Sequence, residues 1–274
     1  MLVFVTPHQF TAGICKSLKG KLMNSNVRAI SLTKGMEIDE NGFHLMSQVI
    51  SNHLGIDCSV LMGANIANEI AVERFSEATV GYSILSNGNT WAELFNTPYF
   101  QIRIIDDVPG PEMCGTLKNI VAIGAGMVDG LKLGNNSKAA IIRIGMQEII
   151  KLSKMFFPTV KDATFFESCG IADLITTCFG GRNRKCGEAF VLARGEKTFV
   201  ELEAELLGGQ KLQGVLTSDE VQHVLKKIGK ENEFPLFTTI NRIINGHLDP
   251  IQIVDYADLP QSREDMSPQA RAHE

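Results

Sequence analysis

The feature that most constrains this chain is the regular alternation of short β-rich runs and amphipathic helical runs over its first hundred residues. Three predicted strands are the runs LVFVTP, VRAISLTKG and CSVLMGAN. Each is followed by apolar residues at helical spacing, in HQFTAGICKSLKGKLM, GFHLMSQVISNHLG and ANEIAVERF. EATVGYS and FQIRIID predict two further strands. Such alternation is typical of a parallel sheet with helices on both faces.

Ligands of such a sheet bind beyond the carboxyl ends of its strands. His8, Lys34 and Asn65 each follow one of the first three predicted strands. These side chains are therefore the first candidates for a binding site.

From about residue 109 the β pattern stops and the sequence becomes helical. The fold class we predict is α/β plus all-α, in which an incomplete Rossmann-type parallel sheet domain precedes a helical substrate domain. The boundaries we expect are 1–108 for the first domain and 109–260 for the second. The polar end, PQSREDMSPQARAHE, lacks periodicity, so residues 261–274 are predicted to be a disordered tail.

Charge and cysteine usage exclude several classes of protein. The net charge is -5, with 26 Lys and Arg against 31 Asp and Glu, which argues against a nucleic-acid partner. The six cysteines form no C-x-x-C pair, so we expect no zinc and no disulfides, but buried, reduced thiols. Without a long apolar run or a secretory signal, the chain is expected to be soluble and cytoplasmic, with no membrane partner.

The glycines do not form the usual dinucleotide-binding turn. The first predicted strand runs directly into Pro7, His8 and Gln9, where a glycine-rich turn would be expected. The only similar stretch is GAGMVDG, at 124–130, but its glycine spacing is wrong and it lies in the helical half. We interpret those glycines as sites of close helix packing.

Three polar positions suggest chemistry, and each has a second interpretation. Lys118 stands in the apolar run GTLKNIVAIG, either as a buried acid-base lysine or as a lysine that reaches solvent from a helix edge. Asp173 is either a charge at a helix N-terminus or the partner of a buried lysine. Arg182 and Asn183 follow two glycines and could hold a phosphate, whereas the adjacent Arg184 and Lys185 could be solvated.

Several longer blocks are similar to one known family. In chain order they are PHQF, SLTKG, VLMGANIANE, CGTLKNIVAIGAG, ESCGIADLITTC, GGRNRK and GQKLQG. Together they resemble the cytosolic NAD-dependent glycerol-3-phosphate dehydrogenase of eukaryotes, from residue 1 to about Asp255. The resemblance implies reversible reduction of dihydroxyacetone phosphate by NADH, giving sn-glycerol 3-phosphate, and a homodimer.

The same resemblance assigns roles to individual residues. The catalytic residues it implies are Lys118, Asn119, Asp173 and Thr177. The substrate contacts are Lys34, Lys118, Arg182 and Asn183, and the NAD contacts are Phe10, Ala67, Arg182, Lys211 and Gln213. No metal is implied.

The sequence departs from that family at its start, where the glycine-rich strand–turn–helix is absent from residues 1–274. We therefore expect a truncated form with an exposed sheet edge, weak NAD binding and little activity. Two alternatives stay open. One is a related dehydrogenase with another substrate, and the other is a non-catalytic module that keeps the substrate domain and oligomerisation.

Overall fold

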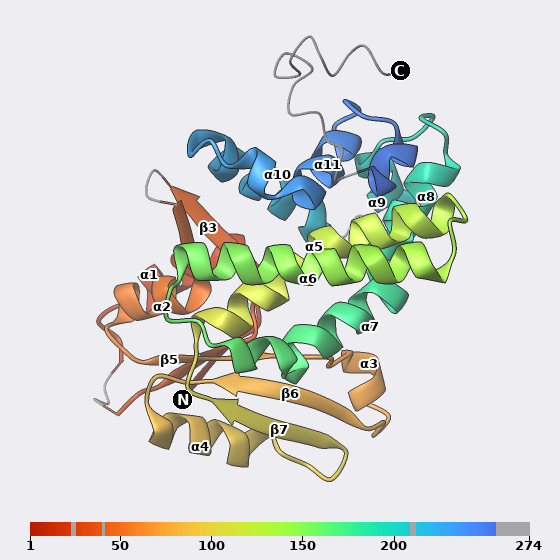
Figure 1. Cartoon of the computed structure of the whole chain (residues 1–274). Helices are drawn as coiled ribbons and strands as arrows, with labels where there is room; N and C mark the ends of the chain where they lie inside the picture. Colours follow the sequence, from red (N-terminus) through yellow and green to blue (C-terminus); the bar gives the residue numbers. More distant parts are fainter. Residues whose placement is uncertain (23–25, 40–41, 209–211, 256–274) are drawn as a thin grey trace. The chain divides into compact units, whose positions relative to one another are not determined.

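The computed structural model describes residues 1–22, 26–39, 42–208 and 212–255. The chain divides into two compact units. Figure 1 shows the helices and strands that make them up. Unit 1 comprises residues 1–119 and 149–181, and unit 2 comprises residues 120–148 and the described residues from Arg182 onward. The long helices α5 (Pro109–Gly130) and α6 (Asn135–Phe156) contribute to both units. The boundary predicted at residue 108 stays a prediction, and the predicted tail at 261–274 lies outside the described residues.

Unit 1 is built on a five-stranded sheet of order β1-β2-β5-β6-β7. The strands are β1 (Leu2–Phe4), β2 (Ala29–Ser31), β5 (Cys58–Met62), β6 (Ser76–Gly81) and β7 (Phe100–Ile105). All five were predicted from the sequence. With the helical unit 2, the sheet confirms the fold class of a Rossmann-like domain and a helical domain.

One strand pair differs from the predicted parallel arrangement, because β5 and β6 run antiparallel with Met62 opposite Thr79. Their connection contains only the four-residue helix α3 (Ala67–Ile70), whereas a parallel crossover usually needs a longer helix. The chain therefore turns back instead of crossing the sheet. As a result, the start of β6 lies at the edge where β1, β2 and β5 end.

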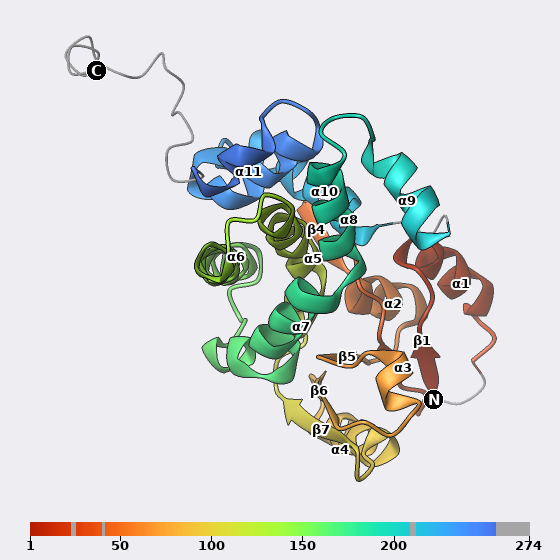
Figure 2. The same ribbon diagram turned by 90° about the vertical axis from the view of Figure 1, so that its right-hand side faces the viewer.

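Helices cover both faces of this sheet, as predicted. Cys15 of α1 (Thr11–Leu18) and Ile50 of α2 (Met46–Leu54) pack in one cluster with Ala29. Trp91 of α4 (Leu85–Phe95) packs in a second cluster with Ile30. Because successive strand residues point to opposite faces, the helices α1 and α2 lie on one side of the sheet and α4 on the other (Figure 2). Helix α4 itself was not predicted.

A second difference is the two-stranded hairpin of β3 (Met36–Asp39) and β4 (Gly42–Leu45). The sequence analysis predicted helix from Gly42 onward, but α2 begins only at Met46. Phe43 of β4 packs edge-on against Phe156, with ring centroids 4.6 Å apart. The Asn-Gly dipeptide before this strand is a hairpin signal that the helical pattern obscured.

A buried carboxylate joins α5 to α2 within unit 1. Glu112 accepts hydrogen bonds from the Ser47 hydroxyl and from the Ser47 N–H, the latter at 3.2 Å, in the first turn of α2. Burial raises the pKa of Glu112 to about 7, against the hydrogen bonds from Ser47 and Met46. The first turn of α5 is thereby attached to the layer of helices on the sheet.

The rest of the described chain is helical, in agreement with the pattern from residue 109 onward. Its α-helices are α7 (Asp173–Gly180), α8 (Arg182–Leu192), α9 (Phe199–Leu207), α10 (Gln213–Lys227) and α11 (Pro235–Ile244). Short turns are η1 (His8–Phe10), η2 (Asp162–Phe166), η3 (Ser168–Ala172), η4 (Glu231–Glu233) and η5 (Pro250–Val254). Helix α8 was not predicted.

The glycines of 124–130 allow close packing inside unit 2, as interpreted from the sequence. A Cβ at Gly124 would lie 2.8 Å from the Ile240 side chain, and one at Gly126 would overlap the Arg184 carbonyl. The six cysteines are buried and free, which agrees with the prediction that they are buried. Within the described ranges, none of the helices has the length and apolar character needed to cross a membrane.

Candidate active site

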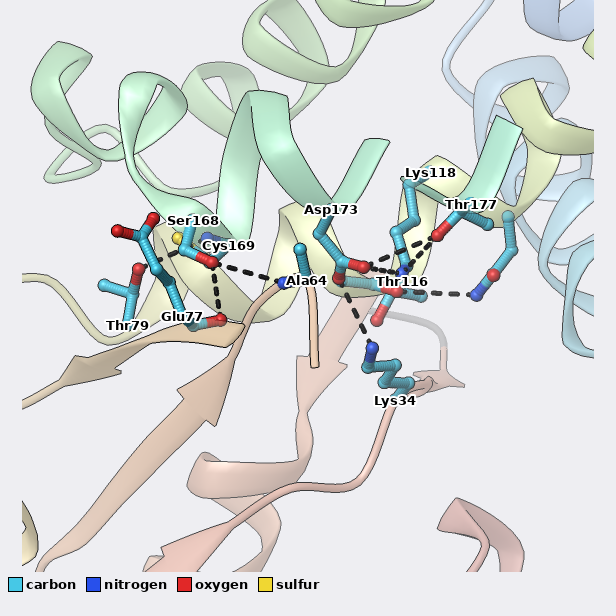
Figure 3. A network of polar contacts seen from close by, with 12 residues as sticks. Lys34, Ala64, Glu77, Thr79, Thr116, Lys118, Ser168, Cys169, Asp173 and Thr177 are labelled. Atoms are coloured by element: carbon cyan, nitrogen blue, oxygen red, sulfur yellow. Dashed lines mark hydrogen bonds and ion pairs between the residues drawn. The ribbon is translucent and has the colours of Figure 1, made fainter. Parts of the chain in front are cut away.

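Three of the four predicted catalytic side chains meet in unit 1 (Figure 3). The Lys118 ammonium donates to Asp173 Oδ1 and, at 2.6 Å, to Thr177 Oγ1. The other carboxylate oxygen, Asp173 Oδ2, accepts from Lys34 Nζ at 3.3 Å. One carboxylate therefore bridges two lysines.

Each member of this group comes from an element that fixes its direction. Lys118 lies on α5 among fully buried neighbours such as Leu117, and only 4% of Lys118 is exposed. It is therefore a buried lysine and not one that reaches solvent. Asp173 is the first residue of α7, and Thr177 lies one turn later on the same face, 3.4 Å from Asp173 Oδ1. Asp173 thus fulfils both interpretations, as a charge at a helix start and as the partner of a buried lysine.

The surroundings of Lys118 bring its pKa close to neutral pH. Burial lowers the pKa of Lys118 to about 7, and the Lys34 ammonium acts in the same direction. The Asp173 carboxylate opposes both effects. A lysine with this pKa can donate and accept a proton near physiological pH, as a general acid-base catalyst must.

Lys34 is held by its neighbour Gly35, which follows β2. The Gly35 N–H donates to Thr116 Oγ1 at 3.1 Å, and Thr116 lies on α5 two residues before Lys118. Gly35 has a φ of 143°, and a Cβ there would come 2.6 Å from His8 Nδ1. The sequence analysis missed Thr116, although it stands inside the quoted block CGTLKNIVAIGAG.

A π-helical turn, η3, leads directly into Asp173 and is attached to the sheet by Ser168 and Cys169 (Figure 3). Such turns often occur at functional sites. The sequence analysis quoted this segment but assigned no role to Ser168. A single serine before an apolar run carries no periodic signal that could have singled it out.

Asn119, the fourth predicted catalytic residue, is next to Lys118 and 6% exposed. Its amide Nδ2 donates to the Gly115 carbonyl of the same helix at 3.4 Å. A catalytic role for Asn119 stays a prediction.

The predicted phosphate-binding residues lie in unit 2, at the start of α8. Arg182 is exposed, whereas Asn183 is buried and its Oδ1 accepts from the Gly214 N–H at 3.1 Å. This bond joins the start of α8 to the start of α10, where Gln213 is the first residue. The predicted cofactor contact Lys211 lies outside the described residues.

The next two residues of α8, Arg184 and Lys185, differ in their contacts. Arg184 pairs with Asp129 at 3.0 Å and with Glu188 at 2.7 Å, so it joins α8 to α5 within unit 2. The interpretation of Arg184 as a solvated charge is therefore wrong. Lys185 is exposed, in agreement with that interpretation.

The remaining cofactor candidates lie at one edge of the sheet. Phe10, 56% exposed, follows β1, and Ala67, also exposed, follows β5. Because β1, β2 and β5 are parallel, their carboxyl ends share this edge with Lys34. Over the residues that the structure describes, no group of three or more His, Cys, Asp or Glu side chains could hold a metal ion.

Family models match both parts of the chain. The model described as "NAD-dependent glycerol-3-phosphate dehydrogenase N-terminus" matches residues 1–87. The model of the C-terminus of the same family matches residues 107–255.

Similar proteins carry the same description. A chloroplastic glycerol-3-phosphate dehydrogenase [NAD(+)] of Arabidopsis thaliana is 62% identical over 93% of this chain, which spans 64% of that protein. A cytoplasmic one of Drosophila melanogaster is 52% identical, over 93% of this chain and 70% of its own length. The solved structure of the Plasmodium falciparum glycerol-3-phosphate dehydrogenase is 42% identical, with a TM-score of 0.90 over 95% of this chain and 73% of its own.

Proposed function

This chain belongs to the NAD-dependent glycerol-3-phosphate dehydrogenase family, and from that premise we propose that it interconverts dihydroxyacetone phosphate and sn-glycerol 3-phosphate. The observation that carries the proposal is the buried group of Lys118, Asp173, Thr177 and Lys34. A buried proton donor whose pKa is lowered toward neutral pH suits the reduction of a ketone.

In the reduction, NADH supplies a hydride when it is bound, and the ketone oxygen gains negative charge. The Lys118 ammonium is the group that we propose to stabilise this oxygen and to protonate it. In the reverse direction the neutral Lys118 amine would take the hydroxyl proton. A pKa of about 7 allows both forms of Lys118 to be present at physiological pH.

Asp173 and Thr177 would direct Lys118, because both accept its hydrogen bonds. The Asp173 carboxylate also favours the charged form of Lys118 and balances the second ammonium, Lys34. We propose that Lys34 contacts the substrate from the end of β2, and that Asn119 completes the group.

The substrate phosphate is assigned to Arg182 and Asn183. Arg182 follows the end of α7 after the single residue Gly181. Arg182 is an exposed residue, and a guanidinium can bind a phosphate through two hydrogen bonds. Fixing the phosphate would orient the carbonyl for reaction.

The cofactor contacts that we propose are Phe10, Ala67, Arg182, Lys211 and Gln213. The positions of Phe10 and Ala67 beyond parallel strand ends support this, since dinucleotides bind there in doubly wound sheets. We also propose a homodimer in the cytoplasm. The buried free thiols suit a reducing compartment, but the relatives' names are divided between cytoplasm and chloroplast.

Steady-state oxidation of NADH tests the substrate and the phosphate assignment together. Because residues 1–274 are expected to bind NAD weakly, the protein used for this and the following kinetic tests carries the family's glycine-rich strand–turn–helix in front of residue 1. It is expected to reduce dihydroxyacetone phosphate much faster than unphosphorylated dihydroxyacetone. Arg182→Ala should lower kcat/KM for the phosphorylated substrate by roughly tenfold to hundredfold, because a charge-assisted bidentate contact is lost. Because Arg182 is also a proposed cofactor contact, the comparison is made at saturating NADH, where Arg182→Ala should leave kcat/KM for dihydroxyacetone nearly unchanged.

Lys185→Ala is the matched control, since it removes another exposed cation from the same helical turn. Lys185→Ala should change kcat/KM neither for dihydroxyacetone phosphate nor for dihydroxyacetone. If the protein with the glycine-rich portion does not reduce dihydroxyacetone phosphate, the proposed function is wrong. Equal losses on both substrates in Arg182→Ala would instead remove Arg182 from the phosphate site.

A further inference from the structure

We propose that Ser168 is a positioning residue, whose hydroxyl holds the turn before Asp173 against the sheet and so aligns Asp173 with Lys118. The contacts that carry this inference all lie within unit 1. Its kinetic consequences rest on the function proposed above, while the alignment itself does not.

The Ser168 hydroxyl uses its donor and an acceptor position. It donates to the Glu77 carbonyl of β6 at 2.8 Å and accepts from the Ala64 N–H, just after β5, at 3.2 Å. Ser168 is 5% exposed. Its loss would therefore leave the partly buried Ala64 N–H and Glu77 carbonyl without this partner.

The surroundings leave the hydroxyl little freedom. Gly63 lies beside it, and a Cβ at Gly63 would come 2.8 Å from Ser168 Oγ and 2.7 Å from the Cα of Ala78. The next residue of the turn makes a second attachment, because the Cys169 N–H donates to Thr79 Oγ1 at 3.2 Å. The turn is thus held at two successive residues.

These attachments depend on the reversed strand. Glu77 and Thr79 are the second and fourth residues of β6, and the antiparallel pairing places Thr79 opposite Met62, the last residue of β5. A parallel β6 would begin at the opposite edge. The strand reversal therefore supplies the acceptors that hold the turn.

The turn also determines the direction of Asp173. Ser168–Ala172 is π-helical and α7 starts at Asp173 without a break, so the phase of the turn sets which way the carboxylate points. In the structure it points at both Lys118 and Lys34 (Figure 3). A turn released from the sheet could shift this direction, and small misplacements at a reacting group are costly in rate.

Misalignment of Asp173 should change the pKa of Lys118 in a definite direction. The charged groups facing Lys118 are Asp173 from the start of α7 and Lys34 from the end of β2, while the Cys114 thiol lies on its own helix. Asp173 is the group that favours the ammonium form. Weakening this contact should lower the pKa of Lys118 and leave more neutral amine near pH 7.

Ser168→Ala is expected to lower kcat for reduction of dihydroxyacetone phosphate by about tenfold, with KM changed less than about twofold. The pH profile of kcat should shift to lower pH. Ser76→Ala is the matched control, because Ser76 is 6% exposed on the same strand β6 and its hydroxyl donates only to the nearby Arg74 carbonyl among the contacts described. It should keep the profile of the unaltered protein.

A second readout needs no turnover. The pH dependence of reductive methylation of Lys118, followed by mass spectrometry, reports when its amine becomes neutral. Its midpoint should fall in Ser168→Ala and fall less in Ser168→Cys, which keeps a weaker donor of similar size. If Ser168→Ala does not fold, the methylation midpoint of Ser168→Cys tests the inference: a lower midpoint supports it and an unchanged midpoint contradicts it.

Unchanged midpoints in the folded Ser168 variants would overturn the inference, and so would an equal shift in Ser76→Ala. Failure of the unaltered protein to reduce dihydroxyacetone phosphate would contradict the proposed function alone. The methylation midpoints would then still decide the role of Ser168.

Discussion

Replacement of Lys118 by alanine is expected to lower kcat for dihydroxyacetone phosphate by about a hundredfold to ten-thousandfold, the usual cost of losing a general acid. NADH binding should stay nearly unchanged, because Lys118 lies on α5 and not among the proposed cofactor contacts. Asp173 would keep Lys34 as a partner, so the site should retain its fold. Steady-state kinetics and a fluorescence titration with NADH measure the two effects.

Lys138→Ala provides the control for loss of a buried, paired lysine. Lys138 is 6% exposed and pairs with Asp129 at 2.7 Å in unit 2. Its replacement should lower the melting temperature but leave kcat nearly intact. A drop of less than tenfold in Lys118→Ala would remove Lys118 from the acid-base role.

Asp173→Asn is expected to have the second large effect. The substitution removes the charge that balances two ammonium groups while keeping the size of the side chain. The pKa of Lys118 should fall, because burial and Lys34 would act without the opposing carboxylate. At pH 7.5 kcat for reduction should fall about tenfold for each unit by which this pKa falls.

Stability should change in the same variant. Removing one partner of a buried ion pair costs about 3 kcal/mol or more, although Lys118 can reduce the cost by losing its proton. Urea unfolding measures the free energy of unfolding, and the pH profile of kcat measures the shift in the pKa of Lys118. An unchanged pH profile in a folded Asp173→Asn variant would contradict the role given to this carboxylate.

The strands and most helices could be predicted because they follow from local periodicity. The apolar run around Lys118 allowed both a buried lysine and one that reaches solvent, and only the packing of the folded chain distinguishes them. The hairpin before α2 was missed because its apolar residues also fit a helical pattern. The direction of β6 depends on the length of the helix between two strands, which a pattern of apolar residues does not encode.

The partners of the site residues depend on contacts between distant segments. Lys118 and Asp173 are 55 positions apart, and Ser168 and Ala64 are 104 apart. The resemblance to a family identified Lys118, Asp173 and Thr177, but Thr116 and Ser168 each act through one hydroxyl on a remote backbone atom. Such single contacts leave no periodic trace in a sequence.

The central claim is that Lys118 exchanges the proton of the reaction, and the pH dependence of kcat in both directions tests it most directly. Reduction needs the ammonium, so its kcat should fall as pH rises through about 7, the pKa of Lys118. Oxidation of sn-glycerol 3-phosphate needs the neutral amine, so its kcat should rise through the same pH. Profiles that change in the same sense in both directions, or that show no titration near pH 7, would contradict the claim.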